Sequence, residues 1–269
     1  MSEIISSLQN PRIKRAAKLR QRRQRARQRR TLIDGVREVN RALDGLVHLN
    51  ELFYCGRFCD SAQGMFTVER ARQRGIETIE TTPRVFEKLA YGARSEGLVA
   101  VATVAEPRLD EVEFDPGRVV AVVEGIEKPG NLGAILRSAD AAGLGGLIVV
   151  DGRTDLYNPN VIRASLGTVF TVPLGIATGP EALAWLLERN RTIHAARVGA
   201  RRDYTECDLT PPAAILLGSE AEGLSLLWSG DKVTDLSLPM CGVADSLNVS
   251  VTAAVLFYES RRQCRAARG

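Results

Sequence analysis

The 269-residue chain is long enough for one large domain or two modest ones, and its 45% hydrophobic and 25% charged residues are ordinary for a soluble globular protein. The net charge of +4 is unevenly distributed, because many basic residues gather near the N-terminus. No apolar run approaches the roughly 20 residues of a membrane span and no secretory signal is recognisable, so we expect a cytoplasmic protein that does not enter a membrane.

The N-terminal arm, residues 12–30, carries most of this charge asymmetry. It contains eleven Lys or Arg residues and no Asp or Glu, whereas the remaining 25 basic and 32 acidic residues leave the rest of the chain at −7. A basic arm on a mildly acidic body favours a polyanionic partner, most simply a nucleic acid, although a solvated helix face is the plainer alternative. Residues 11–30 contain no Gly and no Pro after Pro11, so we expect them to be helical, at least when bound.

Residues 1–104 alternate short helical and strand patterns, which predicts a small α/β domain. Helices are expected at residues 36–43, 63–74 and 83–89, and strands at residues 52–55, 76–79 and 98–104. Residues 105–117 contain two prolines and five acidic side chains, and we interpret them as a linker between two domains.

Residues 118–269 continue this alternation, which favours an α/β fold with a mostly parallel sheet and helices on both faces. Strands are expected at residues 119–123, 147–150, 169–172, 192–196, 213–217 and 236–238, and helices at residues 131–143, 160–166, 180–189 and 246–262. The first of these strands is entirely apolar, as in a strand that is buried on both faces.

Three short motifs lie next to strands of this second domain, where open α/β sheets build ligand sites. In the first motif, Asn131 is expected to cap a helix, and Arg137 lies on the helix face opposite the apolar stripe. Free N–H groups at a helix start and a permanently charged guanidinium suit an anion or a polar ligand. A simple helix cap and a surface arginine are the alternative.

The second motif, Leu-Gly-Ser-Glu at residues 217–220, ends an apolar strand with a glycine that permits close approach to the backbone and with a carboxylate at the sheet edge. In the third motif, Pro239 ends the last strand and leaves nearby backbone groups free to bind an adenine edge. Ser246 is expected to cap the terminal helix. A turn and helix caps explain each motif by itself equally well.

Several common catalytic patterns are absent. The sequence has neither the dinucleotide-binding nor the P-loop glycine signature. Its cysteines are odd in number and scattered, which fits neither a disulfide framework nor a zinc site; they are Cys55, Cys59, Cys207, Cys241 and Cys264. With only His48 and His194, no hydrolase pattern is present, and we expect no metal and two histidines that are structural or exposed.

Taken together and in order, the three motifs resemble those of the SpoU (TrmH) branch of the SPOUT RNA methyltransferases. The matching patterns are N-x-G-A-I-x-R at residues 131–137, L-G-x-E-x-x-G-L at 217–224, and L-P-M followed by S-L-N-V-S at 238–250. Residues 157–170 are also similar to this family, and residues 10–14 and 34–39 resemble its ribosomal-protein-like substrate-binding domain. Asp34, where Glu is expected, and Ser95-Glu96-Gly97, where Pro-Gln-Gly is commoner, depart from the pattern.

The resemblance implies a SPOUT fold, an α/β domain with a deep C-terminal trefoil knot, in a homodimer whose active site lies at the subunit interface. It implies methyl transfer from S-adenosyl-L-methionine to a ribose 2′-hydroxyl of RNA, with ribosomal RNA favoured over transfer RNA. The residues implied to bind the cofactor are Leu217, Gly218, Leu238, Met240 and Leu247.

The catalytic residues implied by the resemblance are Asn131, Arg137, Glu220, Ser246 and Asn248. A guanidinium does not readily give up its proton, so we expect Arg137 to grip a phosphate and stabilise the developing alkoxide, while the other four orient Arg137 and the ribose. The expected RNA-binding residues are Arg12, Lys14, Arg15, Lys18, Arg22, Arg23 and Arg163.

Two functions of other classes compete with this interpretation. A non-catalytic, ribosome-associated RNA-binding factor would explain the basic arm, but it leaves Arg137, Glu220 and Asn248 without a role. A nucleotide-dependent enzyme of the ordinary doubly wound type would need phosphate-binding glycines, which the sequence lacks.

Overall fold

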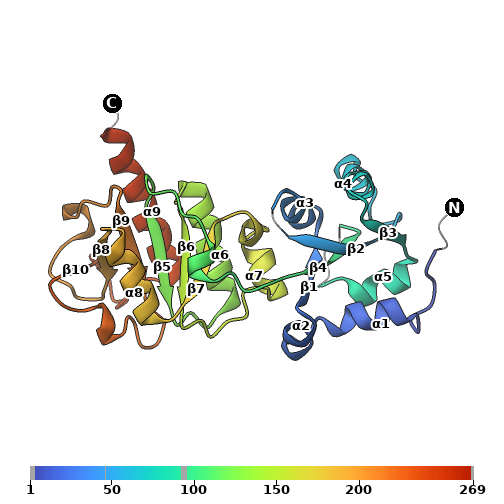
Figure 1. Ribbon diagram of the computed structural model, residues 1–269, viewed down its shortest axis with the longest axis horizontal. Helices are drawn as coiled ribbons and strands as arrows, with labels where there is room; N and C mark the ends of the chain where they lie inside the picture. Colours follow the sequence, from blue (N-terminus) through green and yellow to red (C-terminus); the bar gives the residue numbers. More distant parts are fainter. Residues whose placement is uncertain (1–3, 46, 92–95, 268–269) are drawn as a thin grey trace. The chain divides into compact units, whose positions relative to one another are not determined.

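The structure, a computed structural model, describes residues 4–45, 47–91 and 96–267 and divides into two compact units (Figure 1). The first unit consists of Met1–Ala105 and Leu156–Thr171, and the second of Glu106–Asp155 and Val172–Gly269. Residues 156–171, which we expected in the C-terminal domain, therefore belong to the N-terminal unit. As a result the chain passes between the units three times.

The first unit is built on a four-stranded sheet in the order β1-β4-β2-β3, in which β4 is antiparallel to both its neighbours and β3 is parallel to β2. Its strands are β1 (Arg30–Asp34), β2 (His48–Tyr54), β3 (Glu77–Glu80) and β4 (Leu98–Thr103). Its helices include α1 (Pro11–Lys18), α2 (Arg22–Gln28), α3 (Val36–Asp44), α4 (Ala62–Gln73) and α5 (Pro83–Leu89). Ile13 of α1 and Phe86 of α5 are fully buried against the sheet.

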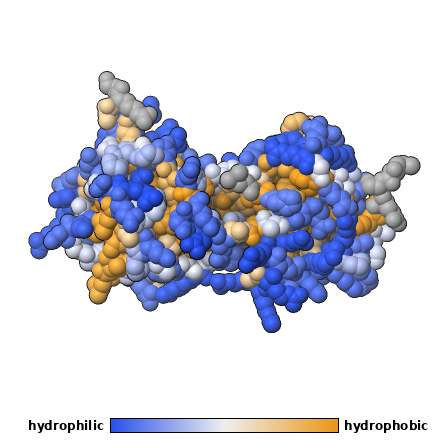
Figure 2. Space-filling view, in the orientation of Figure 1, coloured by the Kyte–Doolittle hydropathy of each residue, from blue (hydrophilic) through white to orange (hydrophobic). Residues whose placement is uncertain are grey.

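The basic arm, which we expected to be helical, forms the two helices α1 and α2 with a break between them, and only its last residue, Arg30, belongs to β1. The first helix ends at Lys18, and the guanidinium of Arg25 then donates to the carbonyls of Leu19 and Arg20, each at 2.8 Å. Arg25 is consequently only 4% exposed. Arg29 adopts a left-handed conformation with φ of 48°, after which the chain enters β1. Figure 2 shows a mostly hydrophilic surface over α1 and α2.

Residues 156–171 contain α7 (Pro159–Ala164) and a 3-10 turn, η2 (Thr168–Phe170). The hydroxyl of Thr31 donates to the carbonyl of Tyr157 at 2.7 Å, and the guanidinium of Arg41 donates to the carbonyl of Leu166 at 2.5 Å. These bonds fasten the segment to β1 and α3. The strand that we predicted at residues 169–172 is wrong, because these residues form η2 and the chain after it; the strand begins later.

The second unit contains a six-stranded sheet in the order β10-β8-β9-β5-β6-β7, with every neighbouring pair parallel. The strands are β5 (Val120–Glu124), β6 (Gly146–Val150), β7 (Leu174–Ala177), β8 (Thr192–Ala196), β9 (Ala213–Leu217) and β10 (Val233–Leu236). The helices are α6 (Pro129–Ala142), α8 (Gly179–Glu188) and α9 (Val249–Ala266), with 3-10 turns η1 (Leu109–Glu111), η3 (Tyr204–Glu206) and η4 (Leu226–Trp228). The predicted α/β class with a parallel sheet is confirmed.

Helices cover both faces of this sheet. Val120 and Val122 of β5 point into a core that also contains Trp185 of α8 and Trp228 of η4. The helices α6 and α9 pack together, and Figure 1 shows α8 and α9 on opposite sides of the sheet. Because the strands are parallel, their carboxyl ends meet at one edge, where the loops before α6 and α9 also begin.

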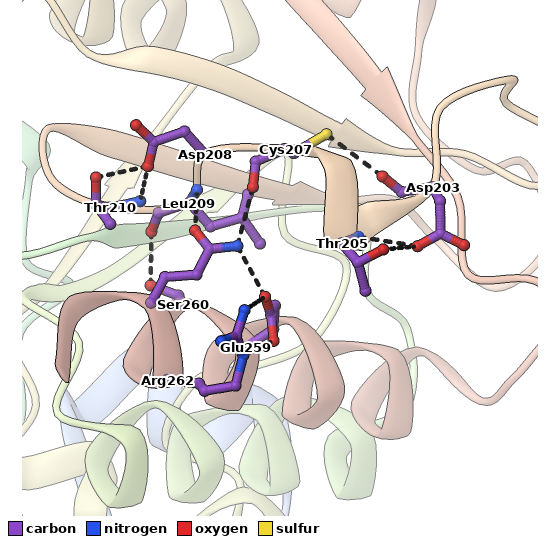
Figure 3. A network of polar contacts seen from close by, with 10 residues as sticks. Asp203, Thr205, Cys207, Asp208, Leu209, Thr210, Glu259, Ser260 and Arg262 are labelled. Atoms are coloured by element: carbon purple, nitrogen blue, oxygen red, sulfur yellow. Dashed lines mark hydrogen bonds and ion pairs between the residues drawn. The ribbon is translucent and has the colours of Figure 1, made fainter. Parts of the chain in front are cut away.

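A polar network fixes the C-terminal half of α9 (Figure 3). Ser260 donates to the carbonyl of Leu209 at 2.8 Å, and the amide of Gln263 both accepts from Leu209 N at 2.7 Å and donates to the carbonyl of Cys207 at 2.9 Å. These bonds join the helix to the chain that leads into β9. None of the described helices is long and apolar enough to cross a membrane.

Candidate active site

A cavity of about 1020 Å³ opens at the carboxyl edge of the six-stranded sheet. It is lined by the ends of β8, β9 and β10, by the loop that follows β10 and by the first turn of α9; these segments are residues 196–199, 217–224, 236–240, 242 and 244–249. Lys128 and Thr252 complete the lining. The second and third sequence motifs therefore meet in one cavity.

The turn at residues 218–223 brings Glu220 to the mouth of this cavity. Ser219 and Gly223 exchange two backbone hydrogen bonds of 3.1 Å each. A Cβ atom on Gly218 would lie 2.1 Å from the carbonyl carbon of Gly223, so only glycine fits at this position. We expected this glycine to let a ligand approach the backbone, and in the structure the group that approaches it is the chain itself.

A chain of hydrogen bonds joins the three motifs. The amide of Asn131 donates to the carboxylate of Glu220, and the amide of Asn248 donates to Asn131 Oδ1 at 3.2 Å. Asn248 Oδ1 in turn accepts from the backbone N–H and the hydroxyl of Ser250, at 2.9 and 2.7 Å. Side chains that are more than a hundred residues apart in sequence are held in one polar cluster.

The structure corrects both helix caps that we predicted. The cap of α6 is Lys128, with Pro129 as its first residue, so Asn131 lies inside the first turn and its amide is free for Glu220. The cap of α9 is Asn248 instead of Ser246. Proline at the first helical position moves the start of α6 upstream, because its fixed φ suits that position and its missing N–H is not needed there.

Arg137 is separated from this cluster. It is exposed on α6, six residues after Asn131, which places it about 9 Å further along the helix axis and on another face. Neither Arg137 nor Asn131 lines the cavity, whereas Glu220, Ser246 and Asn248 do. The geometry thus brings four of the five expected catalytic residues to one region and leaves Arg137 outside it.

All five residues expected to bind a cofactor line the cavity: Leu217, Gly218, Leu238, Met240 and Leu247. Residues 239–248 are exposed, and the backbone groups of residues 238–247 form no hydrogen bond with any other described residue. Free N–H and C=O groups and apolar side chains therefore face the same space. This combination suits a ligand with an aromatic heterocycle and a polar tail.

Sequence reasoning missed residues 197–199, which line the cavity directly after β8. Their position at the carboxyl end of a parallel strand was the available signal. It also missed Glu124 and Trp228, which are buried beside the loop that carries Glu220.

The expected RNA-binding residues of α1 and α2 differ in whether they form ion pairs within the chain. Lys14, Arg15, Lys18 and Arg23 are exposed and form no ion pair with a described residue. Arg12 instead forms two hydrogen bonds of 2.6 Å with Glu77, and this pairing lowers the pKa of the carboxyl group.

Arg22 and Arg163, the other two residues expected to bind RNA, are also exposed. In the first unit, Arg163 of α7 donates to the carbonyl of Tyr91 at 2.6 Å. Arg163, which we expected to bind RNA, therefore also joins α7 to the backbone at Tyr91 within the first unit.

The two histidines take the places that we expected. His48 is exposed at the start of β2, and His194 is buried in β8, where burial lowers the pKa of its imidazole. No group of His, Cys, Asp or Glu side chains that could hold a metal ion occurs among the residues that the structure describes.

Two family models match the chain. Residues 118–258 match the SpoU rRNA Methylase family, and residues 10–100 match the MRM3-like substrate binding domain. A similar curated protein is the 23S rRNA (uridine(2479)-2′-O)-methyltransferase of Streptomyces viridochromogenes, 30% identical over 241 residues that cover 86% of this chain and 82% of that protein. The 23S rRNA (guanosine(2553)-2′-O)-methyltransferase RlmP of Bacillus subtilis is 25% identical over 96% of this chain and 98% of its own length.

Solved structures agree with these matches. The crystal structure of an RNA 2′-O ribose methyltransferase superposes with a TM-score of 0.84 and 39% identity, covering 98% of this chain and 100% of that one. The SpoU methyltransferase AviRb of Streptomyces viridochromogenes in complex with the cofactor AdoMet gives a TM-score of 0.82 at 28% identity, covering 96% and 99% of the two chains. On its motifs, its fold and the match over residues 118–258, the chain belongs to the SpoU rRNA methylase family.

Proposed function

We propose that the protein transfers a methyl group from S-adenosyl-L-methionine to a ribose 2′-hydroxyl of ribosomal RNA. The observation that carries this proposal is the meeting of the second and third motifs at one cavity, with the first motif joined to them through Asn131, to which Glu220 and Asn248 both bond. The relatives that are named as 23S rRNA 2′-O-methyltransferases support both the reaction and the choice of ribosomal over transfer RNA.

The cavity residues fit this cofactor. The side chains of Leu238 and Leu247 offer apolar surface for the adenosine, and the free backbone groups of residues 238–247 can bind the adenine edge. When bound, S-adenosyl-L-methionine supplies an electrophilic methyl group on a sulfonium. The protein's own task is then to bring the ribose oxygen into line with that carbon, so that positioning provides much of the catalysis.

The polar cluster supplies this positioning in our proposal. Asn131 is fixed on both sides by Glu220 and Asn248, so its remaining hydrogen-bonding capacity points in a defined direction for the ribose. Ser246 lies exposed on the cavity wall, where its hydroxyl can reach the same ligand. Arg137 grips a phosphate of the substrate and stabilises the developing alkoxide through its planar, permanently charged guanidinium.

We propose a homodimer as the active form, because Arg137 lies outside the cavity of its own chain. Apolar side chains around the cavity and along α9 are also more exposed than a monomer needs: Val243 104%, Tyr258 51%, Val251 47%, Leu247 39% and Met240 36%. A second copy that covers this surface would bury them, and it would bring its own Arg137 to the cavity.

Residues 1–104 together with residues 156–171 form the RNA-binding part in this proposal, and the rest of residues 118–269 form the catalytic part. The exposed Lys14, Arg15, Lys18 and Arg23 neutralise phosphates, which gives salt-sensitive affinity without sequence choice. We propose the cytoplasm as the location of the protein, which the ribosomal RNA substrates named for its relatives support.

The test is incubation of the protein with radiolabelled S-adenosyl-L-methionine and bulk ribosomal or transfer RNA, followed by digestion to nucleosides. We expect label in a 2′-O-methyl nucleoside from ribosomal RNA. Label only from transfer RNA would overturn the substrate class. Absence of both labelling and cofactor binding would favour a non-catalytic RNA-binding factor.

Arg137→Lys tests the proposal that Arg137 grips a phosphate of the substrate. Lysine keeps the charge but loses the bidentate geometry, so we expect turnover to fall by about 100-fold, the usual cost of a lost transition-state donor, while cofactor affinity stays unchanged. Near-normal turnover of this variant would contradict the role given to Arg137.

A further inference from the structure

Glu124 is a buried carboxylate at the end of β5 that the proposed reaction does not use. It is 8% exposed, and among the described residues no Lys or Arg pairs with it. Its oxygens instead accept three hydrogen bonds, from Ser225 N at 2.7 Å, Ser225 Oγ at 2.8 Å and Trp228 Nε1 at 3.0 Å. A buried charge that is balanced only by such donors fixes their positions strongly, because leaving them unpaired is costly.

Arg197 binds the same short segment through its carbonyl groups. Its guanidinium donates to Leu224 O at 3.1 Å, to Trp228 O at 2.9 Å and, more weakly, to Ser225 O at 3.3 Å. Its Nε also donates to the carboxylate of Asp235 at 3.0 Å, which keeps the guanidinium plane in place. Arg197 itself lines the cavity.

The two charged groups thus hold residues 224–228 in complementary ways. The carboxylate takes the N–H and O–H donors of this segment, and the guanidinium takes its carbonyl acceptors. Leu224 and Trp228 add apolar anchors, being 6% and 0% exposed. The segment directly follows the turn at residues 218–223, whose backbone lines the cavity and whose Glu220 bonds to Asn131.

We infer that Glu124 and Arg197 are positioning residues that hold residues 224–228, and through them the turn bearing Glu220, in the shape that binds the cofactor. This inference rests on the proposed function, because it gives the cavity to S-adenosyl-L-methionine. Glu124 does not line the cavity, and Arg197 holds the segment through its carbonyl groups, so we assign their effect to the fraction of molecules with a competent turn. The apparent dissociation constant rises in inverse proportion to that fraction.

The expected loss of cofactor affinity follows from the hydrogen bond that the substitution removes. A glutamine at position 124 keeps the shape of the side chain, and its single oxygen can still accept from Ser225 Oγ and Trp228 Nε1. Its NH2 group, however, faces the backbone N–H of Ser225 as a second donor, so that hydrogen bond is lost. Loss of a hydrogen bond to a charged group corresponds to roughly a tenfold to hundredfold change. We therefore expect Glu124→Gln to weaken S-adenosyl-L-methionine binding at least tenfold, and we expect saturating cofactor to restore most of the turnover.

Trp228 gives a direct signal of the state of this segment. The chain has two tryptophans, so Trp185→Phe leaves Trp228 as the only indole. In this background we expect Glu124→Gln to shift the emission to longer wavelength and to increase acrylamide quenching, and we expect S-adenosyl-L-methionine to reverse both changes. A merely structural role of Glu124 would not produce a reversal by cofactor.

Glu188→Gln is the matched control, because Glu188 ends α8 in the same unit, is 73% exposed, pairs with the neighbouring Arg189 and does not line the cavity. We expect its cofactor affinity and Trp228 emission to stay as in the parent. Arg197→Lys acts on the same segment from the other side and should weaken binding in the same direction. It provides the test if Glu124→Gln does not fold.

The outcomes separate this inference from the proposed function. If the parent protein does not bind S-adenosyl-L-methionine, the proposed function fails. If the parent binds it and both folded variants bind it equally well, only the positioning role of Glu124 and Arg197 is overturned. Calorimetric titration of the full chain with the cofactor gives the affinities, and labelled methyl transfer gives the turnover.

Discussion

The cavity wall at residues 217–224 and the segment 225–228 that follows it are held by many hydrogen bonds, whereas the wall at residues 238–247 forms none with the described residues. The first wall contains buried side chains such as Leu217 and Leu224, and the second contains exposed ones such as Met240 and Leu247. Both walls follow parallel strands of the same sheet, so the difference lies in their loops.

This contrast indicates a division of labour between the walls. A wall with a fixed backbone has its shape before a ligand arrives, so it loses little conformational entropy on binding. A wall with free backbone groups gains its hydrogen bonds from the ligand or from a second copy of the chain, and it is ordered by them. Substitutions should therefore affect the two walls differently.

Truncation of one apolar side chain in each wall should give the largest contrast. Leu217 is 1% exposed, so Leu217→Ala should lower the free energy of unfolding by about 2–5 kcal/mol. Met240 is 36% exposed, and Met240→Ala should change the free energy of unfolding by only about 0.5 kcal/mol. Urea unfolding measures both values, and equal losses would contradict the division between the walls.

Addition of one methyl group to a glycine in each wall should give the next largest effect. Gly218→Ala places a Cβ 2.1 Å from backbone, and the strain should weaken cofactor binding roughly tenfold to hundredfold. Gly242→Ala meets no atom within 4 Å and should change affinity by less than about threefold. A strong effect of Gly242→Ala would mean that the second wall is as closely packed as the first.

Amide hydrogen exchange should show the smallest contrast, but the most direct one. Exposed, unbonded amides of residues 240–247 should exchange rapidly in the free protein, whereas those of Ser219 and Ser225 should be protected by their hydrogen bonds. Saturating S-adenosyl-L-methionine should slow exchange in the second wall by about tenfold and change the first wall less. Protection of residues 240–247 without cofactor would show that another copy organises that wall.

Much of the fold could be predicted from hydrophobic patterns. The buried apolar runs of β5 and β9 and the amphipathic α6 predicted the parallel sheet and its helices. The strand β1 was missed because its residues follow an unbroken basic segment, and only the pairing of Leu32 and Ile33 with β4 makes them a strand. Local propensity cannot show such a partner, which lies about seventy residues away.

The site was less accessible to sequence reasoning. The motifs indicated that Asn131, Glu220 and Asn248 belong together, and the structure joins them by hydrogen bonds. No local pattern in the sequence indicated that Glu124 and Arg197 hold residues 224–228, because each looks like an ordinary charged residue at the end of a strand. Their partners become visible only when β5, β8 and β9 lie side by side in the sheet.

Residues 156–171 have a consequence for building chimeric enzymes. They lie within the stretch that matches the methylase family, yet they fold with the N-terminal unit and are fastened there by Thr31 and Arg41. If only residues 1–105 were replaced by those of a relative, the four-stranded sheet would come from the relative, while residues 156–171, which pack with it, would still come from this protein. Exchange of the N-terminal unit between family members therefore requires a crossover that carries both pieces of the chain together.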